Sequence, residues 1–170
     1  QSRSSAASDV YKRQVLKVLK EYGYENKRDK VFLQTFSWSE VKRLREILMP
    51  EAKMDLNLVM LAGTEDEYQW MFNREGMREV GRYADGFGPT KSLIISSSSK
   101  KGRLIISDLV TLAHENGMQV HPYTFRSDAD GIPDYAESFD DLLGFFYFEA
   151  GVDGVFTDFP DQAVKFLSNR

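Results

Sequence analysis

The chain has 170 residues, with 22 Lys and Arg against 26 Asp and Glu and a net charge of −4 at pH 7. This balance provides no basic field for a nucleic-acid backbone, and the absence of cysteine excludes disulfides and thiolate metal sites. No apolar run approaches the length that crosses a bilayer, and a chain of this size can bury about 70% of its unfolded surface.

The first residues differ in character from the rest. Residues 1–14, QSRSSAASDVYKRQ, are polar and lack the apolar region of a secretion signal. They are similar to translated adaptor sequence. We therefore predict a non-native or disordered leader over residues 1–14 and a folded part over residues 15–170. On this hypothesis the natural protein begins upstream and the chain is its C-terminal part.

From Val15 onward, short apolar runs alternate with helical periods, a pattern typical of an α/β fold with a parallel sheet. A helix from Val15 to Tyr22 is expected to end at Gly23, a good left-handed cap. We expect strands over residues 31–35, 56–61, 85–89, 118–122 and 152–156.

Turn chemistry marks the helices between these strands. Ser37 and Glu40 have the spacing of a capping box for a helix ending at Pro50, and Ser107 is a candidate cap for the helix through Leu112. The clearest helix starts after Ser138 and closes at Gly151. Its apolar residues recur at three, four and seven, which indicates packing on a sheet.

Several motifs suggest chemistry but do not meet its requirements. Gly86 and Gly88 lack the third glycine of a dinucleotide fingerprint, and the serines and lysines of residues 90–101 lack phosphate-loop glycines or a catalytic partner. The aspartates of residues 128–134 do not fit a calcium-binding EF-hand. Residues 65–67, three acids, favour a solvated loop, and His114 is expected only to complement a helix dipole.

Residues 118–134 are the most chemically dense. A strand delivers His121, Tyr123 and Arg126 at its outgoing end, a set that suits a phosphate beside an apolar or polyol group. The alternative is a buried tyrosine–histidine hydrogen bond with Arg126 in a structural ion pair. The residues alone leave both interpretations open.

The last stretch, GVDGVFTDFPDQAVKFL, indicates a strand that runs into a helix starting near Pro160. Asp158 lies at the carboxyl end of that strand, where parallel sheets bind ligands. Asp158 and Asp161 also have the spacing of a capping box, so a purely structural role is the competing interpretation.

The runs YGYENKRDKVFLQTFSWSEVKRL, MDLNLV, YADGFGP, VHPYTFRSD and GVDGVFTDFPDQAVKFL, in this order, resemble the C-terminal half of the glycerophosphodiester phosphodiesterases. The closest similarity is to the periplasmic, GlpQ-type members, and it spans residues 15–167. The resemblance implies a partial TIM-like (β/α)8 barrel that contains only the C-terminal strands and helices.

The resemblance further implies hydrolysis of glycerophosphodiesters to sn-glycerol 3-phosphate and an alcohol, with a divalent cation, expected to be calcium, and two histidines as acid and base. The family's His-Arg-Gly, Glu-x-Asp and second His-Asp motifs and its fourth-strand glutamate have no counterpart here. Catalytic residues and metal ligands are therefore expected upstream, none of them in this chain. The positions that remain are the substrate-binding candidates Gln34, Phe36, His121, Tyr123 and Arg126, with Asp158 as active-site support.

Three further expectations follow from the resemblance. The partner is a small-molecule substrate, with neither nucleic acid nor a membrane span involved. The full-length form is expected in the periplasm or outside the cell, with any export signal upstream. The alternative function is a non-catalytic barrel that binds a phosphorylated polyol, because a fold alone does not fix an activity.

Overall fold

The computed structural model describes residues 3–169, with side chains from residue 10 on. Its first element is a long helix, α1 (Arg3–Glu21), which ends in a turn where Gly23 adopts the predicted left-handed conformation at φ +83°. The sequence predicts a non-native or disordered leader over residues 1–14, and in the structure residues 3–14 lie in this helix. Leu16 fixes this helix to the body of the molecule through its buried side chain. The non-native origin of residues 1–14 stays a prediction.

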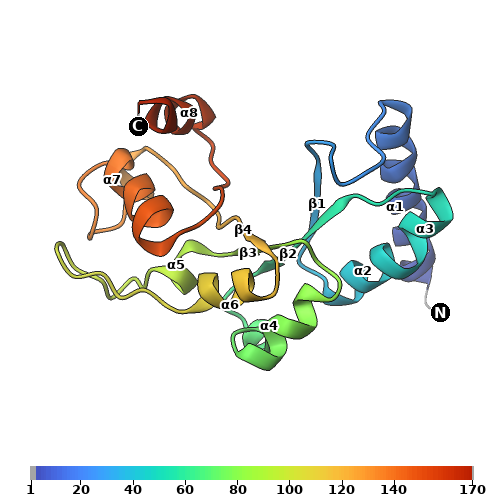
Figure 1. Ribbon diagram of the computed structural model, residues 1–170, viewed down its shortest axis with the longest axis horizontal. Helices are drawn as coiled ribbons and strands as arrows, with labels where there is room; N and C mark the ends of the chain where they lie inside the picture. Colours follow the sequence, from blue (N-terminus) through green and yellow to red (C-terminus); the bar gives the residue numbers. More distant parts are fainter. Residues whose placement is uncertain (1–2, 170) are drawn as a thin grey trace.

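Within residues 3–169, a parallel sheet has the strand order β1-β2-β3-β4. Parallel strands need crossovers, and helices provide them on the outer face of the sheet (Figure 1). The strands are β1 (Phe32–Thr35), β2 (Asn57–Ala62), β3 (Gly86–Pro89) and β4 (Gln119–Val120). The predicted strands before residue 123 are therefore confirmed, with shifts of a residue or two at their ends.

The helices alternate with the strands. The run after Ser37 continues past Pro50 to Ala52, two residues beyond the predicted end. The elements are α2 (Trp38–Arg43), η1 (Leu44–Leu48), α3 (Met49–Ala52), η2 (Asp66–Met71), α4 (Arg74–Gly81), α5 (Lys91–Ile94), α6 (Leu109–Glu115), η3 (Ala129–Gly131), α7 (Phe139–Gly144), η4 (Phe145–Ala150) and α8 (Pro160–Ser168). No helix within residues 3–169 is both long enough and apolar enough to pass through a bilayer.

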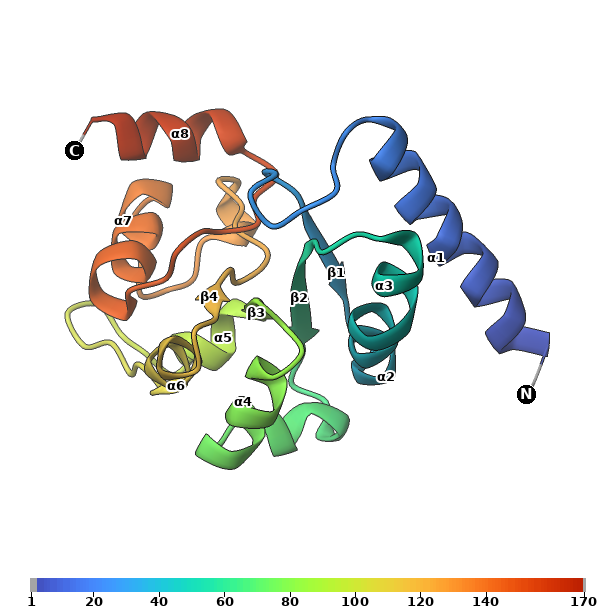
Figure 2. The same ribbon diagram turned by 45° about the vertical axis from the view of Figure 1, so that its right-hand side comes forward.

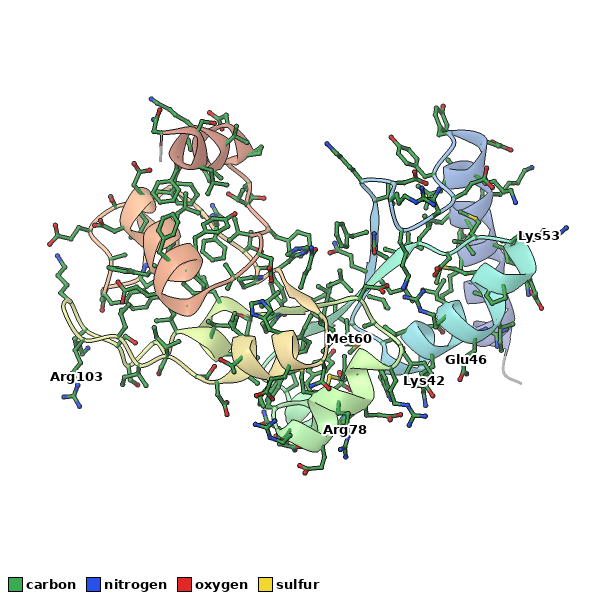
Figure 3. All side chains as sticks on the ribbon, in the orientation of Figure 1. Lys42, Glu46, Lys53, Met60, Arg78 and Arg103 are labelled. Carbon is green, nitrogen blue, oxygen red and sulfur yellow. The ribbon has the colours of Figure 1, made fainter. Side chains whose placement is uncertain are left out.

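The core lies between the outer face of the sheet and these helices. Met60, Phe87 and Val120 alternate with inward-facing residues along their strands and are fully buried. Met60 lies between the sheet and α4 (Figure 3). In both ribbon views α1 and α8 lie on opposite sides of the molecule (Figures 1 and 2).

The sheet is strongly curved. Phe32 of β1 and His121 after β4 have ring centroids only 5.1 Å apart, although two strands separate them in the sheet. One layer higher, Phe36 and Tyr123 are 5.6 Å apart. Contacts between the first and last strands across the concave face require the bend of a barrel wall. A Cβ at Gly88 would lie 2.6 Å from Leu61 Cδ2, so glycine in β3 makes room on this face.

The predicted last strand is only partly formed. The Phe125 N–H donates to Phe156 O at 2.8 Å, and Phe125 and Thr157 form an isolated parallel bridge. The C-terminal segment therefore extends the parallel arrangement beyond β4 without becoming a regular strand. Together with the curved sheet, it defines a partial TIM-like α/β barrel.

The caps predicted at the two ends of the helical run from Ser138 to Gly151 are confirmed. Ser138 accepts a hydrogen bond from Asp141 N, and Gly151 closes the following helical run with φ +80°. Both residues carry out the roles that their positions in the sequence indicate.

Three other predicted caps are wrong. The Ser37 hydroxyl lies 3.0 Å from that of Ser39 and caps no N–H, and Ser107 donates to Leu93 O instead. Before α8, the Thr157 hydroxyl accepts from Phe159 N, which leaves Asp158 outside any capping box.

Candidate functional site at the carboxyl ends of the strands

A cavity of about 450 Å³ opens at the carboxyl ends of the strands. It collects residues from both ends of the curved sheet and from the C-terminal segment, as expected for a parallel barrel. We call it the mouth cavity. Its lining residues are Gln34, Phe36, Leu61, Tyr123, Thr124, Phe156, Thr157 and Asp158. Gln34, Phe36, Tyr123 and Asp158, predicted from distant parts of the sequence, thus meet around one cavity.

Tyr123 and Phe36 form the apolar wall. Their rings meet edge to face, and Phe36 remains 46% exposed because it borders open space. The Tyr123 hydroxyl donates to Ala62 O at 3.1 Å. Burial, helped by the nearby Glu65 carboxylate, raises the pKa of Tyr123, so the phenol stays protonated near neutral pH. This pair can pack against a carbon skeleton while its polar edge stays hydrated.

His121 lies below the mouth cavity and does not line it. Its ring is held edge-on by Phe32 and by Phe156, whose centroid is 6.3 Å away. Burial lowers the pKa of His121, although Asp153 opposes the shift. A neutral imidazole between two aromatic rings suits support of the cavity floor better than direct contact with a phosphate.

Arg126 also lies outside the residues that line the cavity. Its guanidinium donates to both carboxylate oxygens of Asp128, at 2.8 and 3.0 Å, and the side chain is exposed. This ion pair raises the pKa of Arg126. The alternative of a structural ion pair therefore describes the contact that Arg126 makes. The tyrosine–histidine hydrogen bond of the same alternative is not formed, because the Tyr123 hydroxyl donates to Ala62 O instead.

Lys91 is a residue of the site region to which the sequence assigned no role. Its ammonium group donates to Thr124 O and Gly131 O, both at 3.1 Å, and lies 6.0 Å from the centroid of Phe125. Burial, and secondarily the charge of Arg126, lowers the pKa of Lys91. The signal that could have found it is its position two residues after β3, at the carboxyl end of the sheet.

His114 has a more specific partner than a helix dipole. Its Nε2 lies 2.8 Å from the Asp153 carboxylate, which also accepts from Val120 N. The contact links α6 to the C-terminal segment away from the mouth cavity. The prediction that His114 acts only through the dipole is therefore wrong.

The site does not contain a complete cation centre. Among the residues that the structure describes, no group of three or more His, Cys, Asp or Glu side chains could hold a metal ion. Asp158 contributes a single exposed carboxylate at the cavity rim. The donor set present here therefore does not fit a divalent cation.

A curved parallel sheet with outer helices and a cavity at the carboxyl ends of its strands defines part of a (β/α) barrel. The same fold occurs in a putative glycerophosphoryl diester phosphodiesterase from Silicibacter pomeroyi. The structural match has a TM-score of 0.63 at 16% identity and covers 99% of this chain and 48% of that one.

Sequence comparison identifies the family. Residues 1–162 match the model of the glycerophosphoryl diester phosphodiesterase family. The chain is 39% identical to a glycerophosphodiester phosphodiesterase of Haemophilus influenzae and 32% identical to one of Treponema pallidum, over 91% and 89% of its length. It therefore belongs to the glycerophosphoryl diester phosphodiesterase family. It spans about half the length of these relatives, 46% and 47%.

Proposed function

We propose that the chain forms the substrate-facing half of a phosphodiesterase that hydrolyses glycerophosphodiesters to sn-glycerol 3-phosphate and an alcohol. The observation that carries the proposal is the mouth cavity in a chain of this family. Gln34, Phe36, Tyr123 and Asp158 come from three separate segments and line the same space. An amide, two aromatic rings and a carboxylate match the mixed apolar and hydroxylated surface of a glycerol group.

In this proposal each residue has a limited role. Phe36 and Tyr123 pack against the glycerol carbons, and Gln34 and Asp158 bond to its hydroxyls. Arg126 reaches the phosphate by exchanging its exposed partner Asp128 for the substrate, which charge-assisted hydrogen bonds favour. His121 keeps the floor of the cavity rigid and makes no contact with the reacting atoms.

The proton-transferring histidines and the divalent cation, for which we propose calcium, belong on this hypothesis to the part of the barrel outside residues 1–170. A bound cation offsets the negative charge that builds on the phosphoryl oxygens. The described residues contribute binding and orientation only. We further propose that the full-length protein works in the periplasm or outside the cell.

The test is a chimera that joins the N-terminal half of the Haemophilus influenzae relative to residues 1–170. The chimera is expected to release sn-glycerol 3-phosphate from glycerophosphodiesters in the presence of calcium and to stop when the cation is chelated. A folded chimera without release, but with saturable binding of glycerol 3-phosphate, would instead support the non-catalytic polyol binder. Failure of both release and binding would reject both functions.

A further inference from the structure

A hairpin leaves the body of the protein between α5 and α6, over residues 95–107 (Figure 1). We call it the basic hairpin. Ile95 and Ile106 form an antiparallel bridge at its base, and Lys100 and Arg103 form another at its tip. The two tip residues exchange backbone hydrogen bonds of 3.0 and 2.9 Å. Because the hairpin is closed by its own hydrogen bonds, it presents its side chains in a fixed arrangement.

The tip of the basic hairpin is positively charged. Lys100, Lys101 and Arg103 follow closely on one another, and residues 95–107 contain no carboxylate. Lys101 lies 3.3 Å from Glu137, and both side chains of this pair are largely exposed. Lys100 and Arg103 form no ion pair with any side chain that the structure describes. Arg103 projects from the end of the hairpin into solvent (Figure 3). A chain with a net charge of −4 thus carries a local cluster of exposed cations.

Beside these cations the basic hairpin exposes apolar side chains. Ile105 and Ile106 are 49% and 38% exposed. Neighbouring residues of an extended strand point to opposite faces, so the exposure of both shows that the hairpin stands clear of the body. Exposed cations next to exposed isoleucines are typical of segments that lie at a bilayer surface. There the charge attracts anionic lipid, and the apolar side chains leave water.

The position of the basic hairpin leaves it accessible. In both ribbon views it lies on the side of the molecule opposite α1, the element through which an upstream half would join the chain (Figures 1 and 2). It follows β3 by way of α5, so it belongs to a connection at the carboxyl end of the sheet. A surface that binds the hairpin therefore lies at the end of the barrel where the mouth cavity opens.

We propose that the basic hairpin binds the surface of a bilayer that contains anionic lipid. The cations of its tip lie against the headgroup phosphates, and its two exposed isoleucines lie at the boundary with the acyl chains. The isoleucines favour a lipid surface over a nucleic acid or another soluble polyanion, which offers no apolar layer. The inference is independent of the proposed function, because it does not involve the mouth cavity.

The negative net charge of the chain does not prevent this contact. At ~0.1 M salt, charges more than about 10 Å from the surface are largely screened, so the distant carboxylates repel the lipid only weakly. Cations that touch the headgroups keep their attraction, and each is expected to tighten binding about fivefold.

Vesicles of phosphatidylcholine mixed with phosphatidylglycerol are the probe, and vesicles of phosphatidylcholine alone are the control. Co-sedimentation of the chimera should show saturable binding to the anionic vesicles only, and the binding should weaken at high salt. Lys100→Gln with Arg103→Gln should weaken it about 25-fold. Lys53→Gln with Arg78→Gln removes two exposed cations elsewhere on the chain and should leave it nearly unchanged (Figure 3). Equal losses in both double variants, or equal binding to both kinds of vesicle, would overturn the inference.

The apolar contact has its own test. Ile105→Ser with Ile106→Ser should weaken binding to the anionic vesicles about tenfold. Because the chain has no cysteine, Ile105→Cys can carry a polarity-sensitive fluorophore, whose emission should shift to the blue when the chimera binds. The same label at Val164→Cys, on α8, should not shift. Equal shifts at the two positions would remove the hairpin from the contact.

Two further outcomes separate the alternatives. Undiminished binding of the isoleucine variant, together with competition by nucleic acid, would assign the basic hairpin to soluble polyanions and reject the lipid surface. The melting temperatures of the variants should match that of the chimera, because the substituted side chains are exposed. A chimera that binds anionic vesicles through the hairpin but releases no sn-glycerol 3-phosphate would support this inference and count against the proposed function alone.

Discussion

Gly154 and His121 show how single residues build the floor under the mouth cavity. A Cβ at Gly154 would lie 3.0 Å from Cδ2 of His121, so the imidazole occupies the space that a side chain would need. Phe32 and Phe156 hold the ring from other directions. A half-buried neutral histidine of this kind affects the protein mainly through its protonation, because charging it beside apolar packing is unfavourable.

The first prediction concerns the loss of stability at low pH that follows from protonation of His121. Its folded-state pKa lies below its ordinary value of 6.5, so the unfolded chain takes up a proton first. The contribution of neutral His121 to the free energy of unfolding is therefore fully present above about pH 6.5. It is lost as the pH falls through the pKa of the folded state. Melting of the chimera between about pH 5 and 7.5 should show this loss. His121→Asn should flatten this dependence of the melting temperature on pH; an unchanged slope would contradict the prediction.

The second prediction concerns Arg126 in the chimera. Arg126→Ala removes the charged hydrogen bonds that we assign to the phosphate, which should cost about 1.5 to 3 kcal/mol, or about a 10- to 150-fold loss in kcat/KM. The melting temperature should hardly change, because the exposed pair with Asp128 contributes little to stability. Unchanged kinetics together with a lower melting temperature would assign Arg126 to the ion pair alone.

At the scale of elements, the segment of residues 123–131 carries Tyr123 and Arg126 and is fixed by Lys91. The Lys91 ammonium bonds to carbonyls at both ends of this segment, Thr124 O and Gly131 O. A Cβ at Gly131 would lie 2.3 Å from Arg126 Cβ, so the segment also folds tightly on itself. The orientation of Tyr123 and Arg126 after β4 thus depends on a side chain that follows β3.

The third prediction is that Lys91→Met loosens this segment. The change keeps much of the side chain's apolar length but removes both hydrogen bonds, so the free energy of unfolding of the chimera should fall by about 1 to 2 kcal/mol. Hydrogen exchange at the amides of residues 125–131 should become faster. Lys53→Met is the control, because Lys53 points into solvent away from the site (Figure 3). If both substitutions lowered the free energy of unfolding equally, Lys91 would not be the residue that holds this segment in place.

The same elements show what the sequence could and could not predict. Ser138 was predicted as a cap because its partner, Asp141 N, lies three residues away in the chain. The predicted Asp158 cap before α8 does not form. The Thr157 hydroxyl donates to Phe125 O, 32 residues earlier, and accepts the hydrogen bond from Phe159 N. Partners this far apart leave no local pattern.

The candidate site divides in the same way. The alternation of strands and helices predicted that the ends of parallel strands meet, and four of the six site residues do line one cavity. Positions below the cavity or beside it, as for His121 and Arg126, depend on the curvature of the sheet. That curvature follows from inward glycines and aromatic contacts across the barrel, which periodicity does not reveal.

At the scale of the whole molecule, the side that carries α1 and β1 is apolar and open. Val15 and Val18 of α1 are 49% and 43% exposed and face the same way as Tyr11 and Tyr22, at a spacing of three and four residues. Phe32 on the neighbouring strand is also exposed. Within residues 3–169 no strand pairs with the outer edge of β1. Exposed strand edges beside apolar surface promote association between chains.

The final prediction is that residues 1–170 by themselves self-associate, melt without a sharp transition and release no sn-glycerol 3-phosphate, whereas the chimera is monomeric and melts cooperatively. The physical reason is that the chimera supplies strands and helices to cover β1 and α1. Light scattering after size exclusion, together with calorimetry, measures both properties. Val15→Lys with Val18→Lys should reduce association of residues 1–170. Val164→Lys should not, because Val164 lies on α8, although it is more exposed than either valine of α1. A monomeric chain with a sharp melt would show that the open side is stable without a covering partner.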